Sequence, residues 1–180
     1  MMLTKIKAIR SSLLSDSRKV MVLEEWGPRQ TIHGEIHLNK GSEAELPDWL
    51  AKRLQKDGIV KIIDYLTLDD LGRILFQEKQ KPNVPASLTK TDERIYQKVK
   101  ELVYSLKEKN DIESLEQVRK VTSMATEISM VRIRKVVQLS LLGINDEKVM
   151  EKMTEEELLI FRSIREILCS ISGEIYGKTD

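Results

Sequence analysis

The side chains best suited to metal chemistry are two histidines and a glutamate within five residues, His33-Gly34-Glu35-Ile36-His37. Alternate residues of a β-strand share one face, so His33, Glu35 and His37 would lie together as possible metal ligands. Zinc sites usually take a further ligand from another element, and the chain has no third histidine and a single cysteine. We therefore favour a solvated strand face with two bystander histidines, and we expect no bound metal and no cofactor.

The candidates for catalysis and for phosphate binding are weaker still. Cys169 lies between Leu168 and Ser170 without a histidine nearby in the sequence, so we expect a buried structural cysteine rather than a nucleophile. The glycines are scattered and form neither a GxGxxG nor a GxxxxGK loop. The acidic run 155–157 stands at the start of a predicted helix, where carboxylates complement the helix dipole. We expect no catalytic residues and no enzymatic activity.

Basic residues on one long predicted helix are the candidates for phosphate contacts. They are Arg119, Lys120, Arg132, Arg134 and Lys135. Residues 66–180 carry 19 basic and 20 acidic residues, so this part of the chain has no overall positive field. A solvated or ion-paired helix face is therefore favoured, and a DNA-binding module that uses these five side chains remains the alternative.

The same helix has apolar residues on nearly every side between residues 130 and 142. A helix that is apolar all round must be covered on more than one side, and four or five helices of this length more naturally cover one. We therefore predict that another chain packs against this helix. The residues expected at that interface are Met130, Val131, Ile133, Val137 and Leu141.

The elements that carry these residues fall into two parts, and the periodicity changes near residue 65. Before it, the pattern predicts an apolar strand at 20–23, a turn at Trp26-Gly27-Pro28 and an alternating strand over 31–38. A short helix over 46–55 and a strand over 59–63 follow, and a helix of unassigned role is expected over 3–14. We predict a small α+β domain, residues 1–65, whose core contains Leu46, Pro47, Trp49, Leu50 and Leu54.

From residue 66 onward the pattern is helical throughout. Thr67 is a good N-cap for a short helix to about residue 79, and residues 80–91, with Pro82 and Pro85, form a linker. Helices are expected over 92–109, over 112–142 with Gly143 as the stop, and after a capping box at Thr154 and Glu157. The predicted fold class is α+β, mostly α: a connecting helix and linker over 66–91, then a helical domain over 92–180 with long antiparallel helices.

Composition excludes several classes of protein. The net charge of +1 argues against a strongly basic nucleic-acid coat, and the 4% aromatic content argues against base stacking. The longest charge-free stretch, between Lys135 and Asp146, is far shorter than the ~20 residues of a membrane span. The single cysteine favours a reducing compartment, so we expect a cytoplasmic, nucleoid-associated protein, or a nuclear one if eukaryotic.

Residues 44–54, AELPDWLAKRL, resemble the small domain of the GINS family, the replication proteins that hold together the replicative helicase. The family pattern is a Leu or Val, then Pro-x-Trp-Leu-Ala-x-x-Leu, followed by a strand, here 58–63. The residues that match are Pro47, Trp49, Leu50, Ala51 and Leu54.

The resemblance continues, in order, over residues 20–172. Glu78-Lys79 resembles the end of the family's short connecting helix, and a proline-bearing linker follows. Arg132 and Lys135 align with the family's Arg-x-x-Lys-Ile segment, with Val136 where Ile is commoner. The segment MTEEE at 153–157 resembles the Met-Thr-x-x-Glu start of the last helix.

The resemblance implies a subunit of the small-domain-first type, with simple domains that look archaeal. It implies a tetramer in which helical domains pack together, with a helical-domain-first GINS subunit as partner. The implied function is a non-catalytic scaffold that links the MCM helicase to a Cdc45/RecJ-like protein and to primase, with weak or indirect DNA contact. The linker 80–91 would then be the hinge between the two domains.

Overall fold

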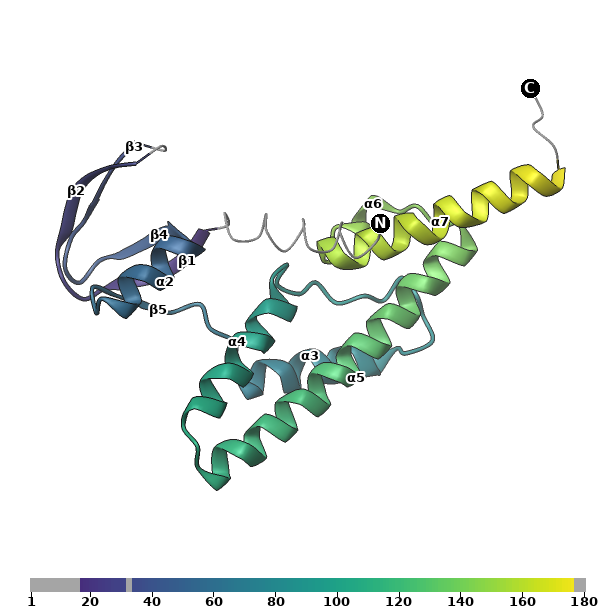
Figure 1. Ribbon diagram of the computed structural model, residues 1–180. Coiled ribbons are helices and arrows are strands. Elements are labelled where there is room, and N and C mark those ends of the chain that lie inside the picture. Colours follow the sequence, from purple (N-terminus) through teal and green to yellow (C-terminus); the bar gives the residue numbers. More distant parts are fainter. Residues whose placement is uncertain (1–16, 32–33, 177–180) are drawn as a thin grey trace. The chain divides into compact units, whose positions relative to one another are not determined.

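The computed structural model describes residues 17–31 and 34–176, and the chain divides into two compact units. Unit 1 ends at Tyr65 and unit 2 begins at Leu66. The fold class is α+β, mostly α, with a small antiparallel β region first and long helices after it (Figure 1). The helix expected over 3–14 lies outside the described residues. Within the described ranges, no helix is both long enough and apolar enough to cross a membrane.

Unit 1 is built on a three-stranded antiparallel sheet with one helix against it. Strand β1 (Ser17–Val22) lies between β4 (Glu43–Pro47) and β5 (Val60–Ile62). Helix α2 (Asp48–Lys56) packs against this sheet. Alternate residues of β1 point toward α2, and the core consists of Val20, Val22, Leu38, Leu46, Leu50, Ala51, Leu54 and Val60.

Strands β2 (Trp26–Thr31) and β3 (Gly34–Leu38) form a separate two-stranded antiparallel sheet. The predicted turn at residues 26–28 is therefore wrong, because this segment is the start of a strand. Pairing passes from Trp26–Leu38 directly to Arg29–Ile36, so residues 27 and 28 lie in an irregularity of the ladder. Pro28 can occupy that position because an irregular position does not require a backbone N–H donor.

The helix predicted over 46–55 begins two residues later than expected. Residues 43–47 pair with β1, with Leu46 opposite Arg18 and Pro47 opposite Ser17. Pro47 has an extended backbone immediately before α2, at the N-cap position rather than inside the first turn. The sequence analysis missed β4 because it assigned Leu46 and Pro47 to the start of the helix, although residues 43–46 alternate polar and apolar side chains.

Unit 2 is a set of helices that pack around α5 (Ile112–Leu142). Helices α3 (Leu68–Gln80), α4 (Ile95–Glu108) and α7 (Glu155–Tyr176) all contact α5, and the short α6 (Glu147–Met150) precedes α7. Two apolar clusters lie along α5. One contains Leu66, Leu71, Leu106, Val121 and Ile128, and the other contains Leu88, Val136, Leu139, Val149, Met153 and Phe161.

Thr67 and Gly143 cap helices of unit 2 as predicted, and Asp111 is a further N-cap, at the start of α5. The Thr67 hydroxyl accepts from the backbone N–H of Asp70 at 3.2 Å, and Asp111 accepts from Ser114 at 2.6 Å. Gly143 ends α5 with a positive φ of 68°, a conformation in which a side chain would be strained. Helix α4 starts three residues after the predicted position, and α6 was not predicted.

Candidate functional site

Arg132 and Lys135 do not lie on a solvated face of α5. Both side chains are completely buried, with 0% of their surface exposed. Their burial excludes these two candidates for phosphate contacts, whereas the ion pairing that the sequence analysis favoured is what they form. They belong instead to a buried ionic cluster, which we define as Glu78, Tyr96, Arg132, Lys135 and Glu157.

Every N–H of the Arg132 guanidinium has a partner. Nε donates to Glu157 Oε1 at 2.8 Å, and Nη2 donates to Glu157 Oε2 at 2.7 Å, which makes a bidentate pair. Nη1 donates to Glu78 Oε1 at 2.7 Å and to the Thr89 carbonyl at 2.8 Å. Nη2 also donates to the Lys152 carbonyl at 2.8 Å. Since a guanidinium has five N–H donors, none remains for a ligand.

The Lys135 ammonium group is equally committed. Its Nζ donates to Glu78 Oε2 at 2.6 Å, to the Glu78 carbonyl at 3.1 Å and to the Ser87 carbonyl at 3.2 Å. These contacts use its three donors. The Glu78 carboxylate, in the last turn of α3, therefore forms an ion pair with both Arg132 and Lys135. Its side chain is itself fully buried.

Glu157 is both a helix cap and an ion-pair partner. Its Oε2 accepts from the Thr154 backbone N–H at 3.0 Å, while the Thr154 hydroxyl accepts from the Glu157 N–H at 3.3 Å, so the predicted capping box is confirmed. Burial alone would raise the pKa of Glu157, but the Arg132 guanidinium outweighs burial and holds that pKa below its usual range. Glu157 Oε1 also accepts from the Tyr96 hydroxyl at 2.6 Å.

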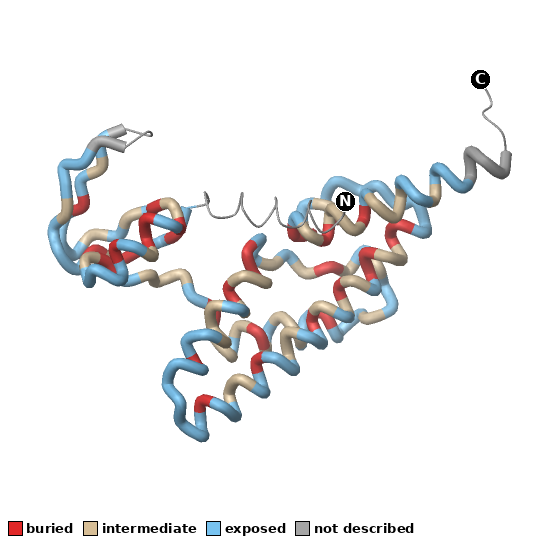
Figure 2. The backbone as a smooth tube through the Cα atoms, viewed as in Figure 1, coloured by how far each residue is buried: buried red, intermediate tan, exposed pale blue. Residues whose placement is uncertain are grey.

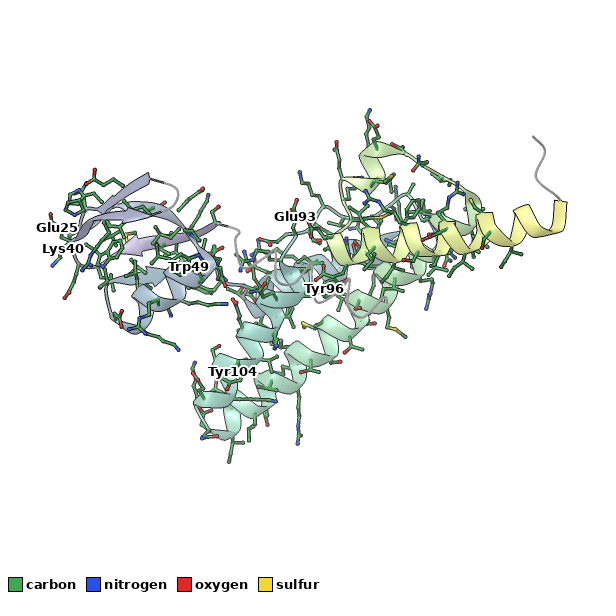
Figure 3. All side chains as sticks on the ribbon, turned by 45° about the horizontal axis from the view of Figure 1, so that its top comes forward. Glu25, Lys40, Trp49, Glu93, Tyr96 and Tyr104 are labelled. Atoms are coloured by element: carbon green, nitrogen blue, oxygen red, sulfur yellow. The ribbon has the colours of Figure 1, made fainter. Side chains whose placement is uncertain are left out.

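Tyr96 closes the cluster from the first turn of α4 (Figure 3). Burial and then the neighbouring Glu157 carboxylate raise the pKa of the Tyr96 phenol, so it remains a neutral hydrogen-bond donor. Burial disfavours the charged form of Arg132, but its hydrogen bonds to Glu157 outweigh this and raise its pKa. The cluster thus holds two cations and two carboxylates, and its geometry supports structure rather than ligand binding.

Three of the five candidate phosphate contacts are exposed on α5. They are Arg119, Lys120 and Arg134. Two lie in the first third of the helix and one lies beyond its midpoint, which spreads them along α5 instead of gathering them into one patch.

The predicted interface residues occupy a helix face that unit 2 leaves partly open. Met130 and Leu141 are 64% and 60% exposed, and Val131, Ile133 and Val137 are half-buried. On the opposite side, Val121, Ile128, Val136 and Leu139 are buried, and Figure 2 shows the buried and exposed positions alternating along α5. The helix is therefore not covered all round within its own unit, and Met130 and Leu141 have their side chains in solvent.

The same side of α5 carries a shallow, open depression nearer its N-terminus. Its described lining consists of Val118, Arg119, Thr122, Ser123, Thr126 and Glu127. Small hydroxyl side chains at this position let another chain approach the helix backbone closely. At 100° per residue, Thr122, Thr126, Met130, Ile133, Val137 and Leu141 share one face of the helix.

In unit 1, Leu46, Leu50 and Leu54 are buried in the core and Pro47 is half-buried. Trp49 is 57% exposed, so the prediction that it anchors this core is wrong. The buried stripe of α2 consists of Leu50, Ala51 and Leu54, and Trp49 belongs to the face that points away from the sheet (Figure 3).

A buried ion pair that the sequence analysis missed lies beside this core. Arg18 of β1 is 2% exposed and donates to Asp48 Oδ1 at 3.0 Å and to Asp64 Oδ1 at 2.8 Å. Asp48 is fully buried and also meets the Lys52 ammonium at 2.8 Å.

The remaining candidates for chemistry are separate from one another. His33 lies outside the described residues, and Glu35 and His37 are exposed on β3. His37 Nε2 lies 3.3 Å from Glu25 Oε1. Among the described residues, no group of three His, Cys, Asp or Glu side chains is placed to hold a metal ion. Cys169 is exposed, so the expectation of a buried cysteine is wrong.

Comparison with known proteins leaves the family open. No protein-family model matches the chain, and no curated protein is significantly similar to it.

Proposed function

We propose that this chain is a non-catalytic scaffold subunit of a GINS-type DNA-replication complex, which links the MCM helicase to a Cdc45/RecJ-like partner and to the primase machinery. It would act as part of a tetramer with a helical-domain-first subunit. Its place would be the cytoplasm at the nucleoid, or the nucleus in a eukaryote.

The observation that carries this proposal is the convergence of three separated sequence segments on one cluster. The end of the connecting helix contributes Glu78, the Arg-x-x-Lys segment contributes Arg132 and Lys135, and the Met-Thr-x-x-Glu segment contributes Glu157. These are the segments of unit 2 on which the resemblance rests. If these motif residues stabilise the fold, a family can share the motifs without sharing a catalytic centre.

The open face of α5 supports a role in assembly. Large apolar side chains in solvent, here Met130 and Leu141, are common at protein–protein contacts when they continue a longer apolar face. Ile133 and Val137 provide that continuity between them. A long helix also sets a fixed distance between whatever binds at its two ends, as a scaffold requires.

The alternative of a DNA-binding module retains only Arg119, Lys120 and Arg134, since Arg132 and Lys135 have no donor left. If DNA binding were the function, affinity would fall steeply with salt and would drop when Arg119 and Lys120 are changed together to Gln. If the chain is a scaffold with weak or indirect DNA contact, its assembly should neither weaken steeply with salt nor weaken when Arg119 and Lys120 are changed to Gln.

The test of the proposal is the solution mass of the chain, alone and with a helical-domain-first partner subunit. For the natural chain we expect either a homotetramer or a 2:2 heterotetramer with the partner subunit. Met130→Asp combined with Leu141→Asp should weaken this assembly at least about tenfold, because it places charges in an apolar contact. Both residues are exposed within unit 2, so the helical circular dichroism should not change.

Lys120→Asp is the matched control, since it alters the charge of α5 on a different side of the helix. It should leave the assembly intact. A monomer that ignores the partner subunit, or equal loss in the control and the double variant, would refute the proposal.

A further inference from the structure

The proline-bearing segment 81–91 has the composition of a flexible linker, yet its backbone is tied down. The Ser87 hydroxyl donates to the carbonyls of Lys81 at 2.8 Å and Val84 at 2.7 Å. The Val84 N–H bonds to the Lys81 carbonyl at 3.3 Å, and the Ser87 N–H bonds to the Val84 carbonyl at 3.0 Å. Residues 81–87 thus form two successive closed turns.

Side chains of the ionic cluster form hydrogen bonds with the backbone in the second half of the same segment. Lys135 donates to the Ser87 carbonyl, Arg132 donates to the Thr89 carbonyl, and Glu78 Oε1 accepts from the Thr89 N–H at 2.9 Å. Between these anchors Leu88 is 2% exposed and packs in the apolar cluster of α5 and α7. Three charged side chains and one buried leucine therefore fasten a stretch of three residues.

The junction between the units lies elsewhere and is very short. On the side of unit 1, Asp64 is bound by the buried Arg18, and the Ile63 N–H donates to the Lys19 carbonyl at 3.0 Å. On the side of unit 2, Leu66 is buried in the apolar cluster of α3, and the cap of that helix follows immediately. Only Tyr65 remains between the two anchors.

Tyr65 has none of the contacts that fix its neighbours. Its side chain is 64% exposed, and within the described chain neither its backbone nor its side chain makes a hydrogen bond. Its two backbone torsions are therefore the least constrained degrees of freedom along residues 62–68.

From these contacts we propose that residues 81–91 are a fixed strap of unit 2 and that Tyr65 is the articulation of the chain. Any change of orientation between the units would be made at Tyr65. This assignment replaces the hinge expected at 80–91, and it holds whether or not the proposed replication function is correct, because it concerns contacts within one chain.

The test inserts Gly-Ser into the full-length chain at two places, after Tyr65 and after Leu88. The insertion after Tyr65 should leave the thermal unfolding of both units unchanged, since no anchor is displaced. The insertion after Leu88 should lower the unfolding temperature of unit 2, because the Ser87 and Thr89 carbonyls can no longer meet their cations together. Equal tolerance of the two insertions, or a loss of stability from the Tyr65 insertion, overturns the proposal.

A single substitution in the strap tests the proposal even if the insertion after Leu88 unfolds unit 2. Ser87→Ala should raise the hydrogen-exchange rate of amides in 81–91 about tenfold, with little change in α5. On a Cys169→Ser background, spin labels at positions 53 and 120 report the spread of distances between the units. The Tyr65 insertion should broaden this spread, and Ser87→Ala should not. Broadening by Ser87→Ala alone would return the hinge to 81–91 and refute the articulation at Tyr65.

Discussion

Removing the Arg132 guanidinium should destabilise unit 2 severely, and Arg132→Met is the sharpest way to show it. The substitution keeps an unbranched side chain of similar length while deleting five hydrogen bonds and one positive charge. It leaves the buried Glu157 without its main counter-ion, while Glu78 retains Lys135.

The expected cost follows from the burial of this pair. Breaking a buried ion pair by removing one partner typically costs about 3–5 kcal/mol, because the other charge is left uncompensated. A domain of this size has a total unfolding free energy of about 5–15 kcal/mol. Arg132→Met therefore removes a large fraction of that stability, which a urea titration followed by circular dichroism at 222 nm would detect.

A second substitution separates lost charge balance from lost packing. In Arg132→Met with Glu157→Gln, one cation and one carboxylate are removed, so Lys135 and Glu78 remain as a balanced pair. The double variant should be more stable than the sum of the two single effects predicts, by about 1–3 kcal/mol. In the double variant the new amide oxygen at position 157 can accept from the Thr154 N–H, while the amide NH2 group can donate to the Tyr96 hydroxyl oxygen, so both positions keep a partner.

Arg134→Met is the matched control, because it makes the same chemical change two residues away on an exposed part of α5. We expect an effect within about 0.5 kcal/mol. The reasoning fails if Arg132→Met and Arg134→Met have equal unfolding midpoints. It also fails if the effects of Arg132→Met and Glu157→Gln simply add.

Three further outcomes follow from the same contacts. Trp49→Ala should cost unit 1 about 1 kcal/mol or less, whereas Leu50→Ala should cost about 2–5 kcal/mol, and comparing the two urea midpoints tests the exposed placement of Trp49. Because the folded-state pKa of Glu157 is lowered, its contribution to stability is present above its ordinary value of 4.5 and is lost as the pH falls through the folded pKa. An acid titration of Arg132→Met should therefore show a shallower loss than the natural chain. Gly143→Ala, at a φ of 68°, should lower stability by about 1 kcal/mol, measurable as a shift in Tm.

Local signals in the sequence were sufficient to place the long helices of unit 2, with α4 three residues off at its start, but not the short α6. The bounds of α5 follow from the Asp111 cap and the Gly143 stop, since both are decided by residues in direct contact with the helix end. Strand β2 was missed because Gly27-Pro28 is typical of a turn. Its place in a strand depends on a pairing irregularity opposite β3, which is a property of two strands together.

The ionic cluster could not be predicted in the same way, because its partners are distant in the sequence. Arg132 lies 25 residues from Glu157 and 54 from Glu78, and Lys135 lies 57 residues from Glu78. With an almost equal number of acidic and basic residues in this part of the chain, composition alone cannot select these pairs. Only the fold of α3, the strap and α7 around α5 brings them together.

A periodic signal for the burial of Arg132 and Lys135 was nevertheless present. The buried residues Ile128, Arg132, Lys135, Val136 and Leu139 follow the spacing i, i+4, i+7, i+8 and i+11, which describes one face of a helix. Two cations on a stripe that is otherwise apolar cannot remain unpaired, so the stripe itself requires buried carboxylates from other elements. Position on the helix also accounts for Trp49, which lies outside the buried stripe of α2 that Leu50, Ala51 and Leu54 form. Position on the helix stripe, more than residue type, decides burial in both units.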